Sequence, residues 1–187
     1  MKSTTIWALL FASTPLLAGC ERQSDAPPAG SASQQAKGVD RRHAGKPAPA
    51  IEIRDAEDEP ASLAEATGTP LLVNIWATWC APCVKELPTL DALSRREGAP
   101  RVIAVSQDMA PRASVEAFLE QHRIGNLEAW HDPEMTLSGA LGAQVLPTTI
   151  YYDAQGRELW RFVGDLDWTG AEAARLLAEV PANAGAS

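Results

Sequence analysis

Cysteine is scarce in this sequence, with only Cys20, Cys80 and Cys83 among 187 residues. Structural zinc sites need four ligands. No second cysteine pair is present to complete such a site, and the three histidines are scattered along the chain without ligand spacing. We therefore predict no bound metal and no cofactor, and each cysteine needs its own explanation.

Positive charge and long apolar runs are also in short supply. The 16 Lys and Arg residues are outnumbered by 24 Asp and Glu residues, which gives a formal net charge of −8 and argues against nucleic acid as a partner. The apolar run from Ile6 to Ala18 is shorter than the ~20 residues that a spanning helix needs. Apolar residues still make up 45% of the chain, which is enough for a packed core.

The N-terminal run has the features of an export signal. Lys2 precedes the apolar stretch, so residues 1–19 are predicted to be a secretory signal peptide. Leu17-Ala18-Gly19-Cys20 matches the bacterial lipobox, in which the cysteine carries lipid; the alternative is an ordinary cleavage site with a chance cysteine nearby. We predict lipidation at Cys20, a flexible tether over 20–46, a folded domain over 47–181 and a disordered tail over 182–187.

The other two cysteines lie where a strand gives way to a helix. Residues 70–77 are mostly apolar and predict a buried strand, and residues 84–96 have helical composition. A helix N-terminus stabilises an anion, and the thiolate is the form that attacks a disulfide. We predict that Cys80 is the nucleophile, that Cys83 is the more buried resolving thiol, and that Pro82 stiffens the first turn. A purely structural disulfide across so short a loop would add little stability.

The run from Val73 to Cys83, followed by Glu86-Leu87-Pro88, resembles the thioredoxin superfamily. Within it, the TlpA/ResA-like branch of membrane-anchored, extracytoplasmic thioredoxins is the most similar. The resemblance implies a thioredoxin-like α/β fold, with a central mixed β-sheet flanked by helices on both faces and an extra helix-strand insertion at residues 111–130. It also implies a cis bond between Leu146 and Pro147, opposite the redox pair.

The remaining pattern predicts the order of elements. A strand at 51–53 and a short helix that opens with Ser62-Leu63-Ala64-Glu65 precede the active-site strand. Downstream we expect a strand at 101–106, a helix after Pro111, a strand at 127–130 and a helix at 134–141. A hairpin turns at 153–156 between strands 148–152 and 158–163, and a helix at 170–180 closes the domain.

Several residues are expected to support the redox pair. Glu86 lies one helical turn after Cys83, and a buried carboxyl there could carry the proton of the resolving thiol. The alternative is a surface glutamate that pairs with a lysine such as Lys85. Trp79 and Pro82 are predicted to contact substrate, Trp79 through its flat apolar ring. The resemblance implies that Leu146 and Pro147 also contact substrate, which would lie along them in extended form.

The resulting hypothesis is a lipid-anchored, extracytoplasmic thiol–disulfide oxidoreductase. The resemblance implies the reducing direction, with a transmembrane reductase of the DsbD/CcdA type as electron donor. Its substrates would be exported cysteine-containing proteins, as in cytochrome c maturation or metal-site assembly. An oxidase or isomerase in the same compartment, or a non-catalytic copper-binding lipoprotein, remains an alternative that the sequence does not exclude.

Overall fold

The computed structural model describes residues 36–179. The predicted signal peptide at 1–19, the lipidation site Cys20 and the tail at 182–187 lie outside these residues. Within the described part, none of the helices is both long enough and apolar enough to span a membrane.

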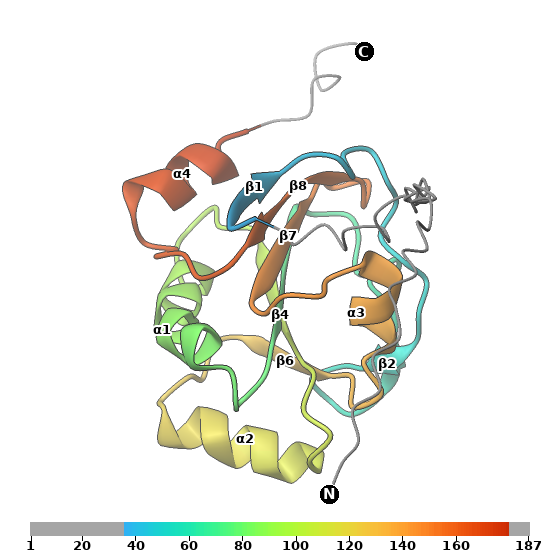
Figure 1. Cartoon of the computed structure of the whole chain (residues 1–187), viewed down its shortest axis with the longest axis vertical. Helices are drawn as coiled ribbons and strands as arrows, with labels where there is room; N and C mark the ends of the chain where they lie inside the picture. Colours follow the sequence, from blue (N-terminus) through green and yellow to red (C-terminus); the bar gives the residue numbers. More distant parts are fainter. Residues whose placement is uncertain (1–35, 180–187) are drawn as a thin grey trace, which may run out of the picture. The chain divides into compact units, whose positions relative to one another are not determined.

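One mixed sheet organises the described part of the chain (Figure 1). Its strands are β1 Gly38–Asp40, β2 Ile53–Arg54, β3 Pro60–Ala61, β4 Leu71–Trp76, β5 Arg101–Ser106, β6 Glu128–His131, β7 Thr148–Tyr152 and β8 Glu158–Val163. Their order across the sheet is β1-β8-β7-β4-β5-β6-β2-β3. Strand β4 runs parallel to β5 and antiparallel to β7, so the predicted mixed sheet is confirmed.

Helices cover both faces of the sheet, as predicted. They are α1 Ala81–Ser94, α2 Arg112–Gln121, α3 Thr136–Leu141 and α4 Ala171–Leu177. Buried residues of α1, α2 and α4 join the hydrophobic cluster on one face, whereas α3 contributes Leu137 and Leu141 to the cluster on the other (Figure 1). The extra helix-strand unit is formed by α2 and β6, and β6 extends the parallel part of the sheet beyond β5.

The alternation of β4 decides which side chains meet the active-site helix. Successive side chains of a strand point to opposite faces. Leu72 and Trp76 accordingly belong to the cluster under α1, and Leu71, Val73 and Ile75 belong to the cluster under α3. Asn74 therefore shares the α1 face with Leu72 and Trp76, which places a buried amide beneath the active-site helix.

The folded part starts earlier than the predicted boundary at residue 47. Gly38–Asp40 forms β1, which pairs antiparallel with β8 at one edge of the sheet. Lys37 also pairs with Asp165, and Arg41 with Glu179. Composition predicted that these residues belong to the flexible tether. A strand of only three residues is too short to show an alternating pattern of apolar and polar residues, and a stretch that contains Pro and Gly follows it.

The predicted helix after Ser62 does not form. Ser62 donates through both its N–H (3.1 Å) and its hydroxyl (2.9 Å) to the Glu65 carboxylate, which is the Glu65 half of the expected capping box. The Glu65 N–H donates to the Ser62 backbone oxygen and not to its hydroxyl. The chain nevertheless makes only turns before Gly68, whose φ of 106° ends any helical course. A single turn fixes many dihedral angles for few hydrogen bonds, so such a short segment does not propagate.

Candidate active site

Cys80 and Cys83 form a disulfide at the N-terminus of α1. Cys80 is the N-cap residue, and its sulfur accepts a hydrogen bond of 3.3 Å from the backbone N–H of Cys83. Cys80 is 6% exposed and Cys83 is fully buried. The Cys83 N–H and the positive end of the α1 dipole thus lie at the sulfur that, once reduced, has to carry negative charge.

The segment between β4 and α1 is held by one buried carboxylate. Asp108 accepts hydrogen bonds from the Thr78 N–H (2.9 Å) and the Thr78 hydroxyl (2.6 Å). Its second link is to Ser106, whose hydroxyl donates over 2.7 Å. Because Thr78 directly precedes Trp79 and Cys80, these bonds fix the approach of the chain to the redox pair.

Glu86 lies in the core, not at the surface. It is 2% exposed, and its Oε1 accepts a hydrogen bond of 2.7 Å from Asn74 Nδ2. Its Oε2 accepts from the Leu166 N–H at 3.0 Å and from the Trp168 indole N–H at 3.1 Å. The surface alternative is therefore wrong, and Lys85 pairs with Asp165 instead.

Burial sets the acidity of Glu86. Loss of solvent raises the pKa of Glu86 to about 7, although the hydrogen bonds from Leu166, Asn74 and Trp168 favour its charged form. The negative charge of Asp165 acts in the same direction as burial. Hydrogen bonds from Lys37 and Lys85 in turn lower the pKa of Asp165 to about 2, so that carboxylate stays charged. Glu86 can therefore gain or lose a proton near neutral pH.

A groove of about 440 Å³ opens at Trp79, the residue that precedes Cys80. The Leu146–Pro147 bond is cis, and Leu146 packs against the cluster that contains both cysteines. Trp79 is 69% exposed, and with Leu146 it borders this groove. The groove is also lined by Gln107, Met135, Gly139 and Gln144. The structure thus brings Trp79 and Leu146 together, while Pro82 is exposed on the first turn of α1.

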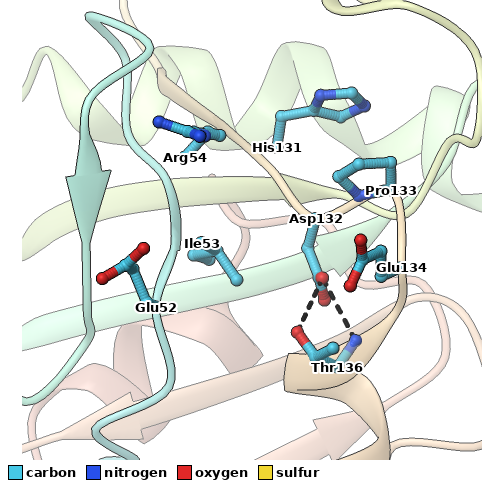
Figure 2. A pocket seen from close by; sticks show the side chains of 8 residues that line it. All are labelled: Glu52, Ile53, Arg54, His131, Asp132, Pro133, Glu134 and Thr136. Atoms are coloured by element: carbon cyan, nitrogen blue, oxygen red, sulfur yellow. Dashed lines mark hydrogen bonds between the residues drawn. The ribbon is translucent and has the colours of Figure 1, made fainter.

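A second cavity of about 200 Å³ lies between the residues around β2 and those that follow β6 (Figure 2). Glu52 and Glu134 line it together with Arg54 and His131. Among residues 36–179, no group of three or more His, Cys, Asp or Glu side chains is arranged to hold a metal ion. This cavity does not include the redox pair.

Sequence reasoning missed three contributors to the site. Trp168 and Leu166 hold Glu86 from 82 and 80 residues away along the chain, and Asp108 holds Thr78 from 30 residues away. Nothing in the sequence links positions so far apart. The only available signal was the type of residue at position 108, an acid two residues after the end of a buried strand.

Comparisons with known proteins agree with this geometry. The Redoxin family matches residues 43–177. Thiol-disulfide oxidoreductase ResA of Bacillus thuringiensis (strain Al Hakam) is 29% identical over 123 residues, which cover 65% of this chain and 70% of the relative. Thiol:disulfide interchange protein DsbE of Pseudomonas aeruginosa is 34% identical over 125 residues, with 66% and 68% covered.

A solved structure supports the fold independently. The crystal structure of a DsbF homologue from Corynebacterium diphtheriae aligns with a TM-score of 0.60 and 23% identity, over 78% of this chain and 94% of that one. At this identity the likeness bears on the fold alone, which is thioredoxin-like. Together with the disulfide at the start of α1, the matches show that the chain belongs to the Redoxin family, as a thiol–disulfide oxidoreductase related to ResA and DsbE.

Proposed function

We propose that this protein, anchored by lipid at Cys20, reduces disulfides in exported cysteine-containing proteins. The observation that carries the proposal is the Cys80–Cys83 disulfide at a helix N-terminus, beside an exposed Trp79 and a groove large enough for part of a polypeptide. Trp79, Pro82, Leu146 and Pro147 would then contact the substrate.

The reaction would proceed by two thiol–disulfide exchanges. The Cys80 thiolate attacks one sulfur of the substrate disulfide; a mixed disulfide forms, and the other substrate sulfur leaves as a thiolate. Cys83, once deprotonated, attacks Cys80 and releases the second substrate thiolate. Two electrons pass from the Cys80–Cys83 dithiol to the substrate, and the protein returns to the disulfide form seen here.

Glu86 would handle the proton of Cys83. Both lie on the buried side of α1, one turn apart, and the pKa of Glu86, raised by burial to about 7, suits transfer in either direction at neutral pH. Asn74, Leu166 and Trp168 keep the carboxyl in place through hydrogen bonds.

The cellular setting is part of the proposal. The Leu17-Ala18-Gly19-Cys20 run supports export and lipidation, which would place the domain on the extracytoplasmic side of a membrane. Electrons would come from a transmembrane reductase of the DsbD/CcdA type. Exported proteins such as those of cytochrome c maturation would be the acceptors.

A trapping experiment tests the reaction and identifies the substrate. In cells that express a Cys83→Ser variant, the mixed disulfide with Cys80 cannot be resolved and should accumulate. Non-reducing gels followed by mass spectrometry of the trapped partner should show exported cysteine proteins. A Cys80→Ser/Cys83→Ser double variant serves as the control, and equal capture by both would contradict the proposal.

Two further measurements test direction and anchoring. A Cys80–Cys83 reduction potential nearer to about −270 mV than to about −120 mV supports a reductase over an oxidase. A Cys20→Ala variant should appear in the soluble fraction, whereas the wild-type protein should sediment with membranes. Unchanged membrane association of Cys20→Ala would rule out the lipid anchor.

A further inference from the structure

Glu86 is almost closed off from water, although its proposed role requires it to exchange a proton with the surroundings. Only 2% of the residue is exposed. Its Oε1 accepts from Asn74 on β4, a strand whose residues are all buried. The amide of Asn74 does not titrate near neutral pH, so it cannot pass a proton on. The proton that Glu86 takes from Cys83 must therefore leave in another direction.

The 164–170 loop covers the other oxygen of Glu86. This loop connects β8 to α4 and passes beside α1 (Figure 1). Oε2 accepts from the Leu166 N–H at 3.0 Å and from the Trp168 indole N–H at 3.1 Å. Leu166 is half-buried, whereas Trp168 is fully buried. Leu166 is therefore the donor that lies between Glu86 and the surface.

The two halves of this loop are held differently. Trp168 donates its backbone N–H to the Thr89 hydroxyl over 3.1 Å, and its ring stacks on Trp160 with the centroids 6.5 Å apart. The first half begins at Gly164, whose φ of 93° lies where glycine is free of strain and other residues are not. A turn of the backbone at Gly164 can move Leu166 outward while Trp168 stays in the core.

Ion pairs at the surface hold the first half of the loop in place. Asp165 accepts from Lys37 Nζ at 2.6 Å and from Lys85 Nζ at 3.0 Å. The side chains of these two lysines are 63% and 78% exposed. Exposed pairs are weak and are screened by salt. They can therefore break while the domain stays folded.

We propose that Asp165 is a positioning residue that holds Leu166 over Glu86, and that this cover opens to let the carboxyl exchange its proton with water. Opening moves the Leu166 N–H away from Oε2, so that water reaches the oxygen and one proton is released or taken up. The inference rests on the proposed role of Glu86 as the proton carrier for Cys83. It adds the path by which that proton reaches the solvent.

The charges around Glu86 decide which variants are informative. Burial is the main cause that raises the pKa of Glu86 to about 7, and the charge of Asp165 acts in the same direction. Within one helical turn of Glu86 and within the loop, the other titratable side chains are Cys83, Lys85 and Asp167, and β4 has none. Cys83 is in the disulfide. A variant of Asp165 changes both cover and charge, whereas variants of its two lysine partners keep that charge.

Hydrogen exchange and a pH jump test the cover in the oxidised protein. NMR follows exchange of the Leu166 amide. Time-resolved infrared spectroscopy follows loss of the protonated carboxyl band, identified by its absence from Glu86→Gln, after a jump from pH 5 to pH 8. In Asp165→Asn both processes should become roughly fivefold faster, as expected for the loss of two exposed ion pairs. Wild-type protection of the β4 amides shows that the domain stays folded.

A second variant separates the cover from the charge. Lys37→Gln/Lys85→Gln breaks the same ion pairs and keeps the Asp165 carboxylate, so both processes should again become roughly fivefold faster. The pKa of Glu86 should fall in Asp165→Asn and should not fall in the double variant. Asp167→Asn is the matched control, because it removes a charge from the same loop but bonds to Thr169 and not to a lysine.

Two results would overturn the inference. Wild-type exchange of the Leu166 amide in both variants would mean that Asp165 does not hold the cover. Faster Leu166 exchange with an unchanged Glu86 response would mean that the proton leaves by another path. Neither measurement uses a substrate, so both results leave the reductase intact. Failure of the Cys83→Ser trap would instead overturn the proposed function.

Discussion

At the scale of single residues, Glu86 shows how burial and chemistry are linked. Its distance from Cys83 along α1 follows from the sequence, and so does the possibility of burial. The hydrogen-bond donors that hold its carboxyl could not be predicted from the sequence, because two of them, Leu166 and Trp168, reach it from a loop after β8. Tertiary contacts between distant positions therefore set the pKa of a residue whose place in the helix was predictable.

Glu86→Gln should separate the two exchange steps. Glutamine keeps the shape but cannot titrate, so resolution of the mixed disulfide by Cys83 should slow by roughly 10- to 100-fold at neutral pH. Attack by Cys80 should change little, because the helix terminus stabilises that thiolate. Stopped-flow measurement of both steps checks this, and wild-type resolution rates across pH 5 to 8 would show that Glu86 takes no part in the transfer.

The same carboxyl makes the stability of the oxidised protein depend on pH. The folded-state pKa of about 7 lies above the ordinary value of 4.5, so the folded state holds a proton that the unfolded state releases. The contribution is fully present below about pH 4.5 and is lost as pH rises through about 7. The difference is on the order of 3 kcal/mol at 1.36 kcal/mol per pKa unit.

Urea unfolding at pH 5 and pH 8 measures this dependence. Both cysteines are in the disulfide, so they add no titration of their own. The free energy of unfolding of the wild-type protein should fall between these pH values more steeply than that of Glu86→Gln. Parallel pH profiles for the two proteins would contradict the raised pKa.

At the scale of elements, the turn from β4 into α1 depends on a carboxylate outside both. The apolar run of β4 and the helical composition after Cys83 predicted these two elements correctly. The link from Asp108 to Thr78 was not predictable, because β5 lies beside β4 only in the folded sheet. The predicted helix after Ser62 does not form for a different reason. The local contact between Ser62 and Glu65 is present, but the segment before Gly68 is too short to continue as a helix.

Asp108→Ala should destabilise the protein by about 1–3 kcal/mol, because the Thr78 N–H and the Ser106 hydroxyl lose their buried acceptor. Urea unfolding at pH 7 provides the measurement. Asp167→Ala is the control, since exposed Asp167 bonds only to nearby Thr169, and surface changes usually stay within about 0.5 kcal/mol. If both variants lowered the free energy of unfolding by a similar amount, the hydrogen bonds of Asp108 would contribute no more to stability than an exposed contact.

At the scale of the whole molecule, the resemblance to TlpA/ResA-like thioredoxins implied the mixed sheet, its helical layers and the extra unit of α2 and β6, and the structure has all three. The predicted N-terminal limit of the domain, residue 47, was too late in the chain. The pairing of β1 with β8 depends on proximity in the fold and not on local composition.

Removal of residues 36–46 should therefore weaken the domain. A variant that begins at residue 47 loses β1 and the Lys37–Asp165 and Arg41–Glu179 pairs. Compared with a variant that begins at residue 36, it should unfold at a lower urea concentration and be cleaved faster by protease within the 164–170 loop. Identical midpoints would show that β1 is dispensable.

Strand β1 has a further consequence, for aggregation. The two edges of the sheet are three-residue β1 and two-residue β3, and Pro60 in β3 has no N–H to offer. Short, interrupted edges are poor templates for a foreign strand. Without β1, six-residue β8 would become the edge and present its backbone to any extended chain. A protein whose proposed substrates are other polypeptides is thereby kept from recruiting them into its own sheet.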